Sequence, residues 1–208
     1  MTGFWSRFRQ NRGAVIGLVI LALVILCAVS APFLFPQSPW SMVQRPFLPP
    51  FEMEGLPLGT DALGRDVLSG LFHGARVSLL VGLVSTVVAL AIGIPIGALA
   101  GYYGGMVDDA LMRFTEFFQT IPSFALAIVL LAIFQPTLGY VILAIAIVSW
   151  PPVARLVRGE VLSLRNREFV EAATLSGQSN LRIILRQVLP NALPPIIVLA
   201  SLMVATAI

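Results

Sequence analysis

Long stretches without a charged residue constrain this chain more than any other feature. The sequence contains 208 residues, of which 58% are hydrophobic and 11% are charged, whereas about a quarter of the residues in a soluble domain are charged. A helix that crosses a membrane needs about 20 apolar residues, so the intervals between charged side chains measure the candidate spans. The sequence therefore predicts an all-α fold, a polytopic transmembrane helical bundle.

Three intervals predict four spans. The first has an apolar part at residues 14–35, and the second, residues 77–107, holds one span that ends near residue 100 and contains Pro95, which predicts a kink. The third, residues 117–154, is long enough for a tight hairpin of two short helices with a turn at residues 135–139. No Asp, Glu, Arg or His falls within these predicted spans, which disfavours a proton-coupled transporter.

The fourth interval follows Arg186 and is still apolar at Ile208. Counted from Leu193 it provides 16 residues, or about 24 Å of helix against a hydrocarbon core of about 30 Å. We therefore expect about five spans, the fifth of them incomplete. We also expect the small residues Gly93 and Gly97 to lack a helical partner.

The basic residues before the first span also fit a cleavable signal peptide, with small residues at Ala28-Val29-Ser30 for cleavage. An apolar part of 22 residues exceeds the roughly 7 to 15 of a signal sequence. The length therefore favours an uncleaved span.

Arginine supplies all thirteen positive charges and is distributed unevenly about the spans. One topology places ten on one side, namely Arg7, Arg9, Arg12, Arg113, Arg155, Arg158, Arg165, Arg167, Arg182 and Arg186. Only Arg45, Arg65 and Arg76 remain on the other side. Because arginine accumulates on the cytoplasmic side, we expect the N-terminus and residues 155–190 inside and residues 36–76 outside.

The composition also excludes several classes of site. The chain has no Lys, so it lacks a phosphate-binding loop of the GxxxxGK[ST] kind, and another chain would have to bind ATP. One cysteine, Cys27, and one histidine, His73, cannot form a disulfide framework or a Cys/His metal cluster. The basic residues flank apolar runs, so nucleic acid is not an expected partner. An intramembrane hydrolase is disfavoured because no GxSxG motif is present.

The segment 155–190 predicts two short helices that meet near Gly177, a residue that adopts positive φ without strain. Ser179 or Asn180 can cap the second helix. Its apolar residues, Leu181, Ile184, Leu185 and Val188, follow the spacing of one helical face. Ala172 and Ala173 would allow another protein to approach closely, although an amphipathic helix resting on lipid headgroups fits the pattern equally well.

Two motifs resemble known permease sequences. Glu171-Ala172-Ala173, Gly177 and Leu189-Pro190 resemble the EAA loop of permease subunits in ABC importers that depend on a binding protein. In that family the loop forms a coupling helix seated in a groove of the ATPase subunit. Gln187 departs from the pattern, which has a hydrophobic residue two positions before Leu-Pro.

The second motif, in residues 58–79, resembles the LGTD-x-x-GRD signature of peptide and nickel importer permeases, more narrowly their dipeptide/oligopeptide C-type subunit. Its residues are Leu58, Gly59, Thr60, Asp61, Gly64, Arg65 and Asp66. Gly59 and Gly64 allow turns, and the apolar residues from Leu63 to Leu71 predict a helix along the outer surface before Arg76.

The resemblance implies a type I ABC importer permease of six spans in a bacterial or archaeal inner membrane. The expected regions are a tail and first helix at 1–36, an external loop at 37–76, and a permease core at 77–208. Expected partners are a second permease subunit in a heterodimer, two ATPase subunits that carry ATP and Mg, an external substrate-binding protein and the lipid bilayer. The chain itself would hold no cofactor or metal and would not be an enzyme. Nickel or glutathione as cargo, and an ATP-independent channel, remain as alternatives.

Overall fold

The computed structural model describes residues 8–134 and 137–208. The chain divides into two compact units, Met1–Leu80 and Val81–Ile208. Every regular element of the described residues is a helix, which confirms the predicted all-α class. Within residues 8–134 and 137–208, four helices are long and apolar enough to cross a membrane, and the bent pair α4–α5 gives a fifth candidate. Arg7 and the expected turn residues Gln135 and Pro136 lie outside the described residues.

The first unit contains α2 (Arg12–Leu34) and the beginning of α3 (Val67–Tyr103), joined by a folded loop. The side chain of Asn11 accepts a hydrogen bond from the amide of Ala14 and so caps α2. Most apolar side chains of α2 are exposed, as expected for a helix surrounded by lipid. Near the end of α2, the His73 Nε2 lies 3.0 Å from the Phe35 carbonyl oxygen.

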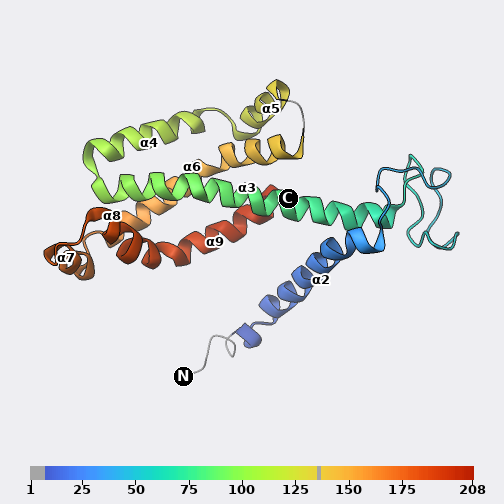
Figure 1. The fold of residues 1–208 in the computed structure, drawn as a ribbon, viewed down its shortest axis with the longest axis horizontal. Coiled ribbons are helices and arrows are strands. Elements are labelled where there is room, and N and C mark those ends of the chain that lie inside the picture. The colour runs from blue at the N-terminus through green and yellow to red at the C-terminus, as the bar shows by residue number, and fades with distance from the viewer. Residues whose placement is uncertain (1–7, 135–136) are drawn as a thin grey trace. The chain divides into compact units, whose positions relative to one another are not determined.

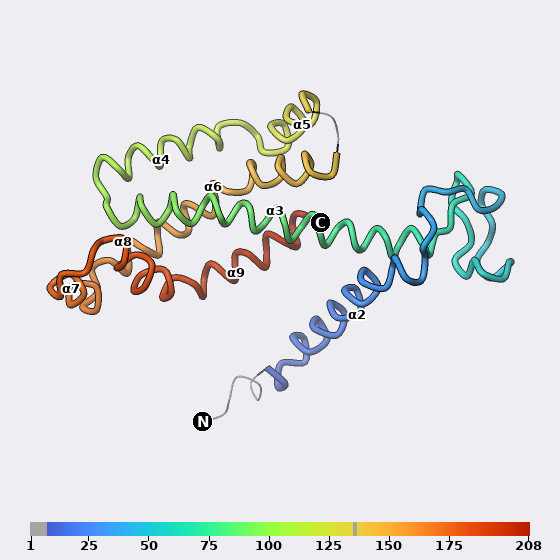
Figure 2. Tube along the Cα trace, viewed as in Figure 1, coloured from blue at the N-terminus to red at the C-terminus, as the bar shows by residue number. Residues whose placement is uncertain are grey.

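The second unit is a helical bundle followed by a short hairpin of helices. Its elements after α3 are α4 (Gly105–Thr120), α5 (Ser123–Ile133), α6 (Leu138–Leu164), α7 (Glu168–Leu175), α8 (Asn180–Ile183), η1 (Ile184–Val188) and α9 (Leu189–Ala207). Figures 1 and 2 show α4 alongside α6, with α7 and α8 at the end where α6 finishes.

Small residues bring α3 and α6 into close contact. A Cβ atom added to Gly93 would lie 2.6 Å from the side chain of Val153, and one added to Gly101 would lie 2.7 Å from the Arg158 carbonyl oxygen. Gly97 lies between them and approaches the carbonyl of Ala154. The expectation that Gly93 and Gly97 lack a partner is therefore wrong, because α6 packs on this stripe as small-residue interfaces do in membranes.

The region predicted as a short hairpin folds differently. α4 ends at Thr120, and α5 starts at Ser123 after a bend of 80°, because the residue before Pro122 is driven out of helical geometry. α6 is not a short arm, since it continues past Ala154 to Leu164. The expected limit before Arg155 is wrong, because α6 continues past the exposed Arg155 and past Arg158, which pairs with Asp108 of α4.

The predicted outer surface helix is also not a separate element. α3 begins at Val67 and continues through Arg76 and Pro95 to Tyr103. The carboxylate of Asp66 accepts a hydrogen bond from the amide of Leu68 and satisfies one free donor at this start. The resulting 37-residue helix is about 55 Å long and exceeds the hydrocarbon core.

The last helical segment starts before Leu193, the residue from which the length of the last predicted span was counted. α8, η1 and α9 together form a candidate span at Asn180–Ala207. Pro190, which has no N–H to donate, lies at the start of α9 directly after the π-helical turn. Ile184–Val188 is a π-helical turn, a local widening often found at functional sites.

Candidate functional site

The candidate site is the segment from α7 to the start of α9. α7 ends in a glycine cap, in which the amide of Gly177 donates to the Thr174 carbonyl and the amide of Gln178 donates to the Ala173 carbonyl. This pair of bonds is a Schellman motif. Gly177 has φ of 72°, so the predicted turn with positive φ is confirmed.

The two alanines of the loop have different environments. Ala173 is only 5% exposed and packs with Val170, Val161 and Ile183 in the main apolar core. Ala172 is exposed and lies about 100° away from Ala173 around α7. The expectation that both alanines are open to another protein is therefore wrong for Ala173, because this residue attaches α7 to its own bundle.

The helical face predicted for the second short helix is partly wrong. Ile184 and Val188 are buried, but Leu181 and Leu185 are 62% and 55% exposed. Ile183 replaces them in the core. The second short helix therefore buries fewer apolar side chains than the spacing predicted, and Leu181 and Leu185 remain exposed. Leu175, at the end of α7, is 89% exposed.

Polar contacts attach the segment to the end of α3. The guanidinium of Arg165 donates to the Gly101 carbonyl at 3.3 Å. A cation at a helix C-terminus is favoured by the helix dipole. The Tyr102 hydroxyl donates to the Asn180 side chain, also at 3.3 Å. Asn180 is thus held to α3, and the side chain of Ser179 makes no capping bond in the part of the chain that the structure describes.

An ion pair between α4 and α6 was not foreseen from the sequence. Arg158 donates from Nε to Asp108 Oδ1 at 2.5 Å and from Nη2 to Oδ2 at 2.6 Å. The Asp108 side chain is 12% exposed and that of Arg158 is 36% exposed. Bidentate pairs of this kind fix orientation as well as charge. The sequence gives no local signal for it, because the partners are 50 positions apart.

The external motif is a folded loop in which most signature residues have a structural role. Gly59 and Gly64 have φ of 70° and 72°, which confirms the predicted turns. The Thr60 hydroxyl donates to the Arg45 carbonyl at 2.7 Å and accepts from the Leu48 amide at 2.9 Å. Leu58 is partly buried.

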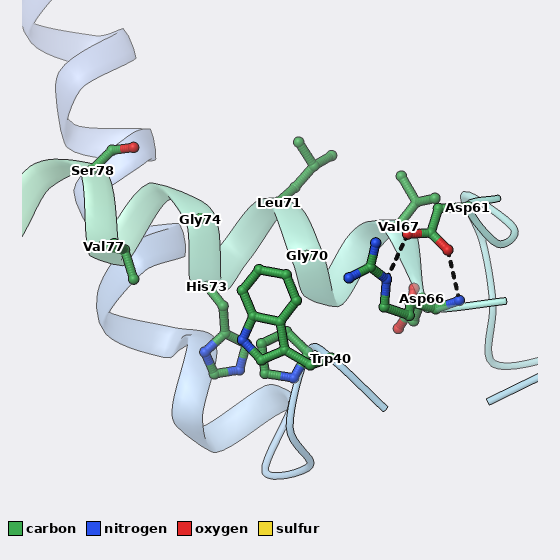
Figure 3. Close-up of a pocket in the computed structure, with 12 residues that line it drawn as sticks. Trp40, Asp61, Asp66, Val67, Gly70, Leu71, His73, Gly74, Val77 and Ser78 are labelled. Carbon is green, nitrogen blue, oxygen red and sulfur yellow. Dashed lines mark hydrogen bonds and ion pairs between the residues drawn. The ribbon is translucent and has the colours of Figure 1, made fainter. Parts of the chain in front are cut away.

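Asp61 organises the turn that leads into α3. Its carboxylate accepts hydrogen bonds from the amides of Leu63 and Arg65 and from the Arg65 guanidinium. Figure 3 shows the two bonds from Arg65 beside the start of α3. The bond from the Arg65 amide holds the pKa of Asp61 below its ordinary value. The Arg65 guanidinium also lies 5.3 Å from the centre of the Trp40 ring.

A cavity of about 700 Å³ lies beside this turn, lined by Trp40, Asp66, His73 and neighbouring residues. Figure 3 shows these side chains around the first turns of α3. Its charged and polar groups are used internally: Asp61 pairs with Arg65, Asp66 contacts the Leu68 amide, and His73 contacts Phe35. Ser78 is a further polar residue of the lining.

Residues 93–208 match the binding-protein-dependent transport system inner membrane component, and residues 1–50 match the N-terminal transmembrane domain of oligopeptide transport permease C. The first match covers more than half of the chain and includes α7, the glycine cap and α9. The chain belongs to this transport family. It is a multi-pass membrane protein, as the apolar helices indicate.

Relatives within the transport family align with nearly the whole chain. The di/tripeptide transport system permease protein DppC of Pseudomonas aeruginosa is 44% identical over 99% of this chain and 69% of its own length. The dipeptide transport system permease protein DppC of Haemophilus influenzae is 37% identical over 99% of this chain and 71% of its own. The oligopeptide transport system permease protein OppC of Escherichia coli K12 is 39% identical over 97% of this chain and 67% of its own length. The resemblance to C-type permeases is confirmed.

Replacing Gly177 with valine is expected to abolish solute uptake by this permease with little loss of membrane abundance. A non-glycine residue in the left-handed region costs about 1–2 kcal/mol, and a β-branched residue is especially unfavourable there. No atom of the described residues lies within 4 Å of an added Cβ, so the cost arises from the backbone. Uptake and immunoblotting of membranes measure the two effects. Gly177→Asn is the control, because asparagine tolerates positive φ, and normal uptake by Gly177→Val would contradict the prediction.

Proposed function

We propose that this chain is the permease subunit of an ABC importer that moves dipeptides or oligopeptides into the cell. The observation that carries the proposal is the geometry of α7: Ala173 fixes the helix to the bundle and Ala172 faces outward. A short helix exposed on one side and anchored on the other is suited to transmit force. The names of the relatives support peptides as the cargo.

The coupling loop, in this proposal, consists of Glu171, Ala172, Ala173, Gly177, Leu189 and Pro190. Glu171 and Ala172 contact the ATPase groove, and Gly177 sets the direction of the chain after α7. Leu189 packs against the apolar core, and Pro190 starts α9. The loop is rigidly joined to α6, because Val157 and Val161 share one core with Val170 and Ala173. A movement of α7 is thereby carried into α6.

The partners follow from this role. A second permease subunit completes the pathway as a heterodimer, two ATPase subunits carry ATP and Mg, and an external binding protein delivers the peptide. ATP binding closes the ATPases, brings the coupling loops together and reorients the helices by alternating access. The signature residues Leu58, Gly59, Thr60, Asp61, Gly64, Arg65 and Asp66 keep the external loop folded beside the binding protein.

The test is uptake by proteoliposomes that contain this permease, its partner permease, the ATPases and the binding protein. Uptake of a radiolabelled dipeptide that requires both ATP and binding protein is the expected result. Uptake of nickel or glutathione but no dipeptide would assign the other cargo. Flux of solute without ATP would identify a channel and contradict the proposal.

The orientation in the membrane provides a separate prediction. We expect the N-terminus and α7 in the cytoplasm and the 37–66 loop outside, because arginine accumulates on the cytoplasmic side. A single cysteine replacing Ala62 in a Cys27→Ala background should react with an impermeant thiol reagent added to intact cells. A cysteine replacing Ser176 should react only after the cells are opened. The reverse pattern would refute this topology.

A further inference from the structure

α4 has three distinct faces, and each has a different kind of side chain. One face packs against α6 through Asp108, Thr115 and Phe118, which repeat at intervals of seven and three residues. Thr115 is completely buried. A second face is apolar and exposed, and it includes Ala110, Phe114 and Phe117.

The third face is polar and exposed. Its residues are Asp109, Arg113, Glu116 and Thr120. Their spacing of four, three and four residues places them within one narrow sector of a helix with 3.6 residues per turn. The sector lies beside the apolar exposed face and away from the face that packs on α6. The exposed surface of α4 is therefore divided into an apolar and a polar half.

Two contacts show that α4 runs along α6. Asp108 pairs with Arg158 near one end of α4, and Phe118 packs on Trp150 near the other, with ring centres 5.3 Å apart. Figures 1 and 2 show the two helices alongside each other over this length. The two contact points are about 12 Å apart along α6 and about 15 Å apart along α4. A helix lying flat on a membrane surface would not make both contacts with a spanning helix.

α6 is a candidate span by its length and composition, and a helix that runs beside it places the polar face of α4 within the depth of the membrane. The distance from Asp109 to Thr120 is about 16 Å, close to half of a hydrocarbon core of about 30 Å. Charged side chains exposed to lipid at this depth are strongly disfavoured, and such residues usually face a water-filled cavity. The apolar half of the surface, with Phe117 64% exposed, is suited to lipid or an apolar partner.

We propose that Asp109, Arg113, Glu116 and Thr120 line the water-filled solute path of the transporter and contact a zwitterionic solute of the size of a short peptide. This assignment of the solute rests on the proposed function. The face offers a guanidinium, two carboxylates and a hydroxyl in one row. These groups complement the charged termini and the amide groups of a peptide, and a row of weak contacts allows the solute to move on.

The test uses single cysteines in a Cys27→Ala background, in the transporter assembled with its partner subunits in proteoliposomes. Cysteines replacing Asp109, Arg113, Glu116 or Thr120 are compared with controls that replace Ala110, Phe114 or Phe117. A charged, impermeant thiol reagent has access from the cytoplasmic face. We expect the polar positions to react about tenfold faster or more, because the charged reagent and the thiolate that attacks it both require water. Saturating dialanine should slow these reactions and leave the controls unchanged.

Equal rates on the two faces, or faster reaction at the controls, would overturn the proposal. Rapid reaction only after the partner subunits are removed would assign the polar face to a subunit interface and would also overturn it. No slowing by dialanine in a transporter that takes up dialanine would refute the solute contact alone. The fast polar pattern in a transporter that takes up no peptide would refute the peptide importer while supporting the water-lined face.

Discussion

Replacing Asp108 with asparagine is expected to destabilise the permease by about 1–3 kcal/mol. The substitution leaves Arg158 charged and without its carboxylate inside the bundle. Breaking a buried pair costs about 3–5 kcal/mol, but the Arg158 side chain is 36% exposed, so water compensates part of the loss. Thermal unfolding of the purified protein in detergent measures the effect as a lower Tm.

Two further variants isolate the ion pair from a general effect of charge. Asp109→Asn removes the same charge from the adjacent, exposed position and should change stability by less than about 0.5 kcal/mol. Arg158→Gln combined with Asp108→Asn leaves no unpaired charge. The double variant should therefore lose less stability than the sum of the losses in the two single variants. Equal Tm values for Asp108→Asn and Asp109→Asn would show that the pair does not stabilise the fold.

The helices and the turns were predictable because their causes are local. Apolar intervals identified α2, α3 and α9, and the positive φ of Gly59, Gly64 and Gly177 follows from residue type and sequence context. A glycine directly after a short helix is most often the residue of positive φ that ends it. These features need no knowledge of which segment packs against which.

The features that escaped prediction depend on contacts between distant segments. The spacing of apolar residues could not show that Ala173 is buried and Ala172 exposed. The two residues are identical in type, and only the packing of α7 places Ala173 in the core. An interval without charges does not set the length of a helix, because α6 continues past the exposed Arg155 to Arg158, which pairs with Asp108 of another helix. The extent of α6 and the path of α4 were misjudged for that reason, and so the polar face of α4 was not recognised.

Because Ala172 is exposed and Ala173 is buried, we expect a bulky substitution at Ala172 to have a large effect on ATPase binding. Ala172→Trp should release the ATPase subunits during purification, because in the proposed role the exposed face of α7 fits closely into their groove. Ala172 lies outside the core, so the variant should retain the membrane abundance and Tm of the unaltered permease. Loss of several close contacts at the centre of an interface costs about 2–4 kcal/mol, which is about a 30- to 1000-fold weaker association.

Ala173→Trp is the matched comparison, since it introduces the same side chain one position away. Ala173 is 5% exposed and belongs to the apolar core that contains Val170, Val161 and Ile183. An indole cannot enter this core without displacing α7 from α6, so we expect this variant to lower both Tm and membrane abundance. ATPase release would then follow from disruption of the permease. Co-purification and ATP-driven uptake distinguish the two cases: an Ala172→Trp permease that keeps its ATPases and its uptake would show that the outer face of α7 is not the docking surface.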